Sequence, residues 1–236
     1  MVLRYRKNTD IVLNKLSFSV KGGEKVGIVG RTGAGKSSLT VGLFRLIEPD
    51  DGQILIDDID ISKVGLAKLR SKLTIIPQDP VTWSGTIRYN LDPIGKTTDD
   101  QIWFALEKAG LKNSVKNMEK DLETEVSEDL SIFSDGEKQM LCLARALLRD
   151  SKVLIMDEAT ASVDNATDKL IQETIAKEFD DWTILTIAHR LNTIIDYDKI
   201  LVLDQGRIEQ FDSPKNLLDL KSGQFYEMCK AAKLVS

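Results

Sequence analysis

Short apolar runs, separated by turn residues and by amphipathic stretches, dominate the pattern along the chain. Residues 26–29 form one such run, directly before a glycine-rich segment. Three later runs, at residues 153–156, 183–187 and 200–203, alternate with stretches of helical periodicity, one of them at residues 165–178. Because strands that alternate with helices form parallel sheets covered on both faces, we expect an α/β core around these runs.

Two regions depart from this alternation. Residues 16–20 alternate between apolar and polar side chains before a Gly-Gly turn, which predicts a strand of a small antiparallel sheet near the N-terminus. Residues 99–149 instead show apolar spacings of three and four, which predict helices. We therefore expect one domain, residues 1–236, in which residues 79–149 form an inserted helical subdomain and residues 1–78 and 150–236 form the core.

Composition narrows the classes of function. The 236 residues are 42% hydrophobic, and the net charge is −5 without any run of Lys or Arg, which argues against a nucleic-acid partner. The longest apolar runs fall far short of the roughly 20 residues that cross a bilayer, so we expect no direct membrane insertion of this segment. Cys142 and Cys229 lie far apart and have no neighbouring His, which indicates packed, reduced thiols.

Residues 30–37 fit the phosphate-binding pattern GxxxxGKS/T between a strand and an amphipathic stretch. Glycines let the backbone turn its N–H groups toward a polyphosphate, Lys36 adds positive charge at the β- and γ-phosphates, and Ser37 offers a hydroxyl to Mg²⁺. A tight strand-to-helix turn with a surface lysine is the alternative, and the flanking elements disfavour it. The candidate nucleotide-binding residues here are Gly30, Arg31, Thr32, Gly33, Ala34, Gly35, Lys36, Ser37 and Ser38.

The apolar run at residues 153–156 ends in two acids, Asp157 and Glu158. Ligands bind at the carboxyl ends of strands in doubly wound sheets, so these acids are expected beside the phosphates. Asp157 is placed to hold Mg²⁺, and Glu158 to orient or deprotonate an attacking water. Alone, the pair would more often be a structural loop; together with Lys36 it favours catalysis.

The segment FSDGEKQ, residues 133–139, precedes this acidic strand where the ABC ATPase family places its signature loop, and the chain resembles that family over nearly its whole length. Other motifs follow in family order. Gln78 in IIPQDP resembles the Q-loop, Asp164 ends a segment similar to the D-loop, and His189 in TIAHR resembles the switch histidine. The resemblance implies an α/β fold: a P-loop NTPase (RecA-like) core with an N-terminal antiparallel β-subdomain and an inserted α-helical subdomain.

The resemblance also implies a head-to-tail pair of cassettes, with each ATP between the cradle of one and the signature loop of the other. The signature residues toward the partner's ATP would be Ser134, Asp135, Gly136 and Glu137, joined by Asp164. Ser134 also fits a helix N-cap, with Glu137 completing a capping box three residues later.

The catalytic set implied by the family is Lys36, Gln78, Glu158 and His189, with Ser37, Gln78 and Asp157 toward Mg²⁺. His189 is the only histidine of the chain and would donate to the γ-phosphate, while Gln78 would reach Mg²⁺ or water.

Tyr5 in LRYR resembles the aromatic residue that stacks on adenine in this family, although a tyrosine there is also typical of a half-buried strand. The segments GIVGRTGAGKSS, NLDP and LTIAHRLNTI together resemble second cassettes of the multidrug-resistance-associated (C) subfamily, as does Glu158. The signature departs from LSGGQ at Phe133, Asp135 and Glu137. Because Glu137 brings negative charge toward a phosphate site, we expect a weakened contribution to the partner's ATP site.

The resemblance implies an ATPase that uses ATP and Mg²⁺ to power export, at the cytoplasmic face of a membrane and joined to the transmembrane domains of the same transporter. One alternative stays open: a regulatory cassette that gates a channel or receptor with little turnover. A soluble ABC ATPase acting on DNA or ribosomes is disfavoured by the acidic balance and the C-subfamily motifs. A kinase is disfavoured because no acceptor site is readable and Glu158 suits water activation.

Overall fold

The computed structural model describes residues 1–127, 132–157, 163–188 and 190–235. The chain divides into two compact units. The first, which we call the sheet unit, comprises Met1–Thr74, Ser151–Asp157 and Asp181–Ser236. The second, the helical unit, comprises Ile75–Asp150 and Glu158–Asp180. Residues 158–180, expected in the core, thus group with the helical unit.

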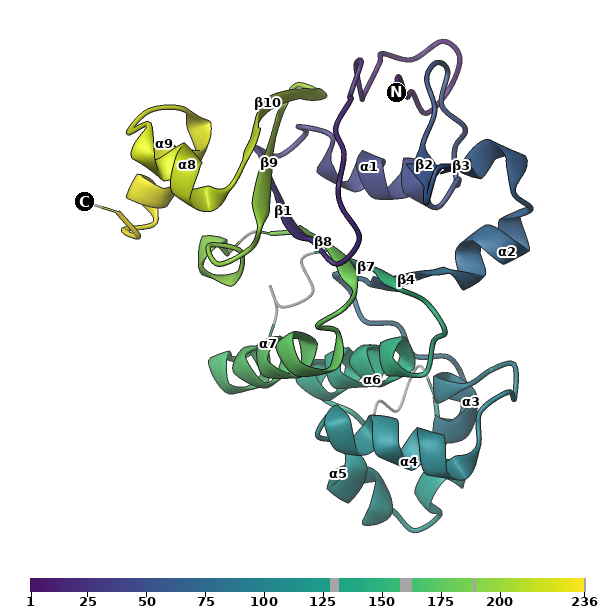
Figure 1. Ribbon diagram of the computed structural model, residues 1–236. Coiled ribbons are helices and arrows are strands. Elements are labelled where there is room, and N and C mark those ends of the chain that lie inside the picture. Colours follow the sequence, from purple (N-terminus) through teal and green to yellow (C-terminus); the bar gives the residue numbers. More distant parts are fainter. Residues whose placement is uncertain (128–131, 158–162, 189, 236) are drawn as a thin grey trace. The chain divides into compact units, whose positions relative to one another are not determined.

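In the described part of the chain, the large sheet has the strand order β10-β9-β1-β8-β7-β4 (Figure 1). Strand β1 pairs in parallel with β8 and β9, β7 pairs in parallel with β8, and β10 runs antiparallel to β9. The four expected apolar strands are confirmed. The strands are β1 Lys25–Val29, β4 Leu73–Ile76, β7 Val153–Asp157, β8 Thr183–Ile187, β9 Lys199–Asp204 and β10 Arg207–Asp212.

Apolar side chains cover both faces of this sheet, which explains the unbroken apolar runs. In β9, Leu201 and Leu203 pack in one buried cluster with Leu39, whereas Ile200 and Val202 pack in another cluster. A strand buried on both faces has no solvent-facing position for a polar residue. The unit's other elements are α1 Lys36–Leu43, β2 Leu55–Ile56, β3 Ile59–Asp60, η1 Ile61–Lys63, α2 Leu66–Ser71, η3 Leu191–Thr193, α8 Pro214–Asp219 and α9 Gln224–Ala231.

The strand expected at residues 16–20 is wrong. The alternation is real, because Leu16 is buried and Phe18 half-buried between exposed serines. Phe18 packs edge-on against Phe211, with ring centroids 5.6 Å apart, but no ladder of backbone hydrogen bonds pairs this segment in the described structure. The antiparallel part near the N-terminus consists of isolated bridges, such as Leu3 to Leu13, and the hairpin β2–β3.

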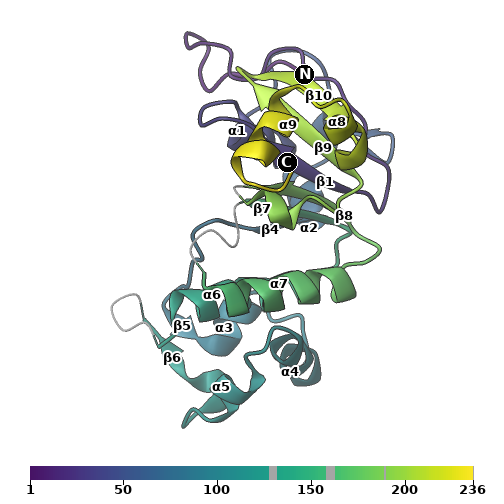
Figure 2. The same ribbon diagram turned by 90° about the vertical axis from the view of Figure 1, so that its left-hand side faces the viewer.

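The helical unit is built around α6, which packs against α4 and α7; Figure 2 shows α6 and α7 side by side. Lys108 at the end of α4 ties to α7 through Glu178, with Nζ 2.8 Å from Oε1. The insertion is not purely helical, because β5 and β6 form a small antiparallel pair. Its elements are β5 Gly85–Thr86, α3 Ile87–Leu91, α4 Asp99–Lys108, α5 Lys112–Lys116, η2 Asp121–Glu123, β6 Glu125–Val126, α6 Asp135–Leu147 and α7 Asn165–Glu178.

Cys142 and Cys229 are buried, and neither is in a disulfide within the described residues. Of the helices that the structure describes, none is long and apolar enough to cross a bilayer.

The packing of β1 predicts the effect of adding one methyl group. A Cβ on Gly27 would lie 2.8 Å from Cβ of Ile194 and 2.9 Å from Cδ1 of Ile200. Gly27→Ala is therefore expected to lower the free energy of unfolding by about 1–3 kcal/mol, measured by urea denaturation. Gly22→Ala, whose Cβ would meet nothing within 4 Å, is the control. Equal midpoints for the two variants would contradict this packing.

Candidate functional site

The loop between β1 and α1 has a shape that requires glycine at two positions. Gly30 has a φ of 155°, and a Cβ there would lie 2.2 Å from the carbonyl oxygen of Leu203. Gly35, the N-cap of α1, has a φ of 101°, and its Cβ would lie 2.6 Å from Cδ2 of Leu13. Any side chain at either position would force the loop off the sheet unit, so the glycine spacing of the motif has a direct structural cause.

Two distant segments brace this loop. The N–H of Gly206 donates to the carbonyl of Ala34 at 3.0 Å, and the carbonyl of Gly206 accepts from the N–H of Asn14 at 2.7 Å. A Cβ on Gly206 would lie 2.1 Å from the carbonyl oxygen of Val12. Sequence reasoning missed Gly206 and residues 12–14, because nothing in the local pattern around them points to the loop.

The donors of the loop point to anion binding. Lys36 folds back over the loop, and its ammonium donates to the carbonyls of Gly30 at 2.9 Å and Arg31 at 3.3 Å. The backbone N–H groups of Gly33, Gly35, Lys36 and Ser37 have no acceptor among the described residues. Free amides at the start of α1, with the positive end of its dipole and an ammonium group, form a cradle for phosphate.

Asp157 lies at the same edge of the sheet as this cradle. In the parallel register, Ile187 of β8 is the partner both of Ile28 in β1 and of Asp157 in β7. Gly30 therefore leaves its strand at nearly the level of Asp157, two strand spacings or roughly 10 Å away. A bound triphosphate with its metal is long enough to span that separation.

The oxygen donors at this edge fit Mg²⁺. Ser37 offers a hydroxyl from the first turn of α1, and Asp157 offers a carboxylate from the end of β7. Mg²⁺ commonly takes one or two protein oxygens and completes its octahedron with waters and phosphates. Among the described residues there is no cluster of three or more His, Cys, Asp or Glu side chains that could hold a metal.

Two expected catalytic residues, Glu158 and His189, lie outside the described residues, while their neighbours are well placed. Asp157 ends β7, and the N–H of Ala188 donates to the carbonyl of Ile28 at 3.1 Å. Asp157 and Ala188 thus both lie at the edge of the sheet that carries the cradle.

Tyr5 and Ser38 meet in the sheet unit. The tyrosine hydroxyl lies 2.9 Å from Oγ of Ser38, which is buried in the first turn of α1. Tyr5 nevertheless keeps 47% of its surface exposed, so its ring remains available for contact. The sequence predicted both residues for nucleotide binding and gave no sign of this contact.

In the helical unit, the predicted capping box at the start of α6 is confirmed. Oγ of Ser134 accepts from the N–H of Glu137 at 3.3 Å, and Oε2 of Glu137 accepts from the Ser134 N–H at 3.0 Å and from its hydroxyl at 2.9 Å. Asp135 pairs with Lys138 at 3.0 Å, and Phe133, the other departure from the family signature, is buried. The Glu137 carboxylate therefore holds the Ser134 hydroxyl within the cap.

Asp164 caps the neighbouring helix α7. Its carboxylate accepts from the N–H groups of Ala166 at 2.9 Å and Thr167 at 3.1 Å, and from the Thr167 hydroxyl at 2.7 Å. The hydrogen bond from Thr167 lowers the pKa of Asp164 and keeps it ionised. A Cβ on Gly136 would lie 3.4 Å from the side chain of Thr167, so this predicted signature residue lies beside the first turn of α7, which Asp164 caps.

Gln78 is exposed and belongs to the helical unit, in a stretch without helix or strand that follows β4. The carbonyl of the preceding Pro77 accepts from the side-chain amide of Gln139 at 3.1 Å. Further along the same stretch, Asn90 donates to the carbonyl of Trp83, and Arg145 donates to the carbonyl of Val81. Sequence reasoning missed Gln139, Asn90 and Arg145, since their contacts join residues far apart in the chain.

Comparisons with known proteins agree with these motifs. The family model described as ABC transporter matches residues 13–161. The chain is 52% identical over 233 residues to the ATP-binding cassette transporter abc2 of Schizosaccharomyces pombe, covering 99% of this chain and 16% of that protein. It is 54% identical over 232 residues to the human ATP-binding cassette sub-family C member 3, covering 98% of this chain and 15% of that protein. The same identity holds for the metal resistance protein YCF1 of Saccharomyces cerevisiae, at 99% and 15% coverage.

Among solved structures, a bacterial Atm1-family ABC exporter with ATP bound matches with a TM-score of 0.91 at 38% identity, covering 100% of this chain and 41% of that one. The chain therefore spans about one sixth of the curated relatives and less than half of the exporter chain. From the matched family model and the identity with C-subfamily proteins over nearly its whole length, the chain belongs to the ABC transporter family, as an ATP-binding cassette of the C subfamily.

Proposed function

We propose that this cassette binds and hydrolyses ATP with Mg²⁺ and powers export as the second cassette of a C-subfamily transporter. The observation that carries the proposal is the convergence of the Lys36 loop and Asp157 at one edge of the sheet, fixed by the register of β1, β8 and β7. A metal alone or a phosphate alone would need only one of these features. Both together match a triphosphate and its metal.

Each residue then has a distinct role. The loop amides and Lys36 hold the β- and γ-phosphates, and Ser37 with Asp157 holds the metal, which neutralises charge that develops on the phosphates. Glu158 accepts the proton of the attacking water, and His189 donates to the γ-phosphate. Gln78 orients the metal or the water. Tyr5 stacks on the adenine.

The signature residues indicate that this cassette pairs with a second cassette. The N-terminus of α6 is suited to bind an anion, and it comprises the signature residues Ser134, Asp135, Gly136 and Glu137. The phosphate cradle of this chain already has its own donors, which belong to the sheet unit. A second cassette in a head-to-tail pair would use these signature residues, with Asp164 beside them. Transmembrane domains of the same transporter would hold the pair at the cytoplasmic face of the membrane.

Steady-state phosphate release distinguishes a cassette that powers export from a regulatory cassette with little turnover. The full-length protein is expected to release phosphate continuously, and Glu158→Gln is expected to lower this rate at least 100-fold, because a general base contributes roughly 10²–10⁴. Binding of ATP should survive the substitution. Wild-type protein that binds ATP without measurable turnover would support the regulatory alternative instead.

The exposed ring of Tyr5 predicts a difference between two substitutions. Tyr5→Ala should raise the Kd for Mg·ATP at least about fivefold, since stacking of a base on an aromatic ring contributes roughly 1–3 kcal/mol. Tyr5→Phe keeps the ring and loses only the hydroxyl contact with Ser38, so its Kd should change less than about twofold. Equilibrium binding of a fluorescent ATP analogue measures both. Equal effects of Ala and Phe would argue against stacking.

Neutralising the carboxylate of Glu137 should raise the rate of ATP hydrolysis at the partner's site. Glu137→Gln keeps the geometry of the capping box and removes one negative charge near the partner's phosphates, so turnover at the site this loop completes should rise about two- to fivefold. Phosphate release by the full-length two-cassette protein at low salt measures this, because salt screens the repulsion. Unchanged nucleotide affinity and turnover would remove the charge argument.

A further inference from the structure

Arg145 is a half-buried cation on α6, and its partners in the described part of the chain include no carboxylate. Its guanidinium donates to the carbonyl of Asn90 at 2.6 Å, to the Asn90 side-chain oxygen at 2.9 Å and to the carbonyl of Val81. Its Cζ also lies 4.4 Å from the ring centroid of Trp83. Burial lowers the pKa of Arg145, yet arginine stays protonated in proteins, so these carbonyls and the ring stabilise a full charge.

Asn90 turns this contact into a fixed loop. It is fully buried, and its amide nitrogen donates to the carbonyls of Trp83 at 2.8 Å and Thr86 at 3.1 Å. Its side-chain oxygen accepts from the N–H of Trp83 at 2.8 Å as well as from Arg145. The side chain of Asn90 thus holds residues 83–90 in one conformation and also binds the guanidinium of Arg145.

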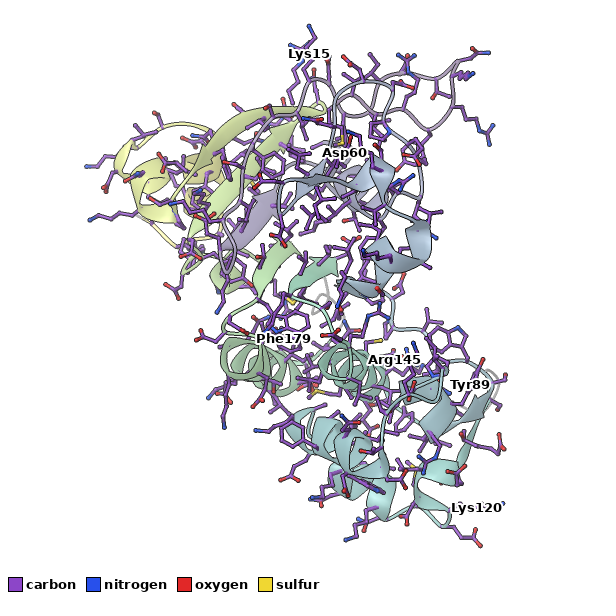
Figure 3. The ribbon with its side chains drawn as sticks, turned by 45° about the vertical axis from the view of Figure 1, so that its right-hand side comes forward. Lys15, Asp60, Tyr89, Lys120, Arg145 and Phe179 are labelled. Carbon is purple, nitrogen blue, oxygen red and sulfur yellow. The ribbon has the colours of Figure 1, made fainter. Side chains whose placement is uncertain are left out.

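A second residue of α6, Gln139, binds the backbone at Pro77, where the stretch that follows β4 begins. Gln139 is almost fully buried, and its amide donates to the carbonyl of Pro77 at 3.1 Å. The thiol of Cys142 lies 3.7 Å from the Arg145 guanidinium. Gln139, Cys142 and Arg145 are spaced by three residues and therefore line one side of the helix. Figure 3 shows Arg145 on α6, toward the part of the chain that carries Tyr89.

Gln78 lies between the two attachments, after Pro77 and before Val81, in a stretch that has no helix or strand of its own. The placement of such a stretch depends on the side chains that bind its backbone. We propose that Arg145 is a positioning residue for Gln78, which acts by fixing residues 77–90 on α6, the helix that Ser134 caps. This inference rests on the proposed ATPase function, in which Gln78 orients the metal or the attacking water.

A double-mutant cycle on ATP turnover of the full-length protein tests the inference. Arg145→Gln should lower kcat roughly three- to tenfold with KM unchanged, because the cradle residues belong to the sheet unit. In a Gln78→Ala background, the same substitution should lower kcat less than twofold, since residues that act through one another are not additive. Arg145→Lys keeps the charge, loses the planar fork and should fall between wild type and Gln; it also serves if Arg145→Gln does not fold.

Lys108→Gln is the matched control. It removes another partly buried cation of the helical unit, whose contacts, Glu178 and the ring of Phe104, lie on α7 and α4. The kcat of this variant should stay within twofold of the wild-type value, and its melting temperature should fall about as much as that of Arg145→Gln. Equal fold-losses for Arg145→Gln in both backgrounds, a raised KM with unchanged kcat, or no loss at all would each overturn the positioning role.

Amide hydrogen exchange on the same proteins separates failure of this inference from failure of the proposed function. Arg145→Gln should lower the protection of residues 79–84 about tenfold, and Lys108→Gln should not. If wild type binds ATP without turnover, the ATPase proposal fails and the exchange result alone decides whether Arg145 fixes the segment. Unchanged protection in Arg145→Gln would contradict the inference whatever the turnover.

Discussion

The site depends on one constraint, the parallel register that joins β1, β8 and β7. Ile187 is hydrogen-bonded into the ladder at the level of Ile28 on one side and of Asp157 on the other. A shift of two residues in either pairing would move the phosphate loop or the acidic end by about 7 Å, and a shift of one would turn the side chains to the other face. The buried clusters on both faces of β9 and the rest of the sheet hold that register, because a slip would expose apolar residues.

The cradle adds local geometry to this edge. Gly30 and Gly35 adopt backbone conformations that bring the loop against Leu203 and Leu13, and Gly206 locks it from a different turn. Free amides then lie at the first turn of α1. A cassette that binds a triphosphate needs such preorganised donors, since donors that had to be ordered on binding would cost part of the interaction free energy.

Much of this was readable from the sequence wherever the determining contacts are local. Apolar runs marked the central strands, and the three-residue spacing from Ser134 to Glu137 marked the capping box. The strand expected at residues 16–20 failed because alternation reports which side chains are buried, as at Phe18, and says nothing about a pairing partner. The contact of Tyr5 with Ser38 and that of Arg145 with Asn90 join residues 33 and 55 positions apart, and no local pattern encodes them. The helical unit similarly carries a β5–β6 pair that its helical periodicity concealed.

In the proposed function, the Lys36 loop and Asp157 bind one Mg·ATP together. Calorimetric titration of ATP with Mg²⁺ and with EDTA, on wild type and on Asp157→Asn, tests whether they do. Wild type should gain affinity from Mg²⁺, Asp157→Asn should lose most of this gain, and both should bind metal-free ATP alike. An equal gain from Mg²⁺ in the two proteins would mean that Asp157 does not contact the metal of the bound nucleotide.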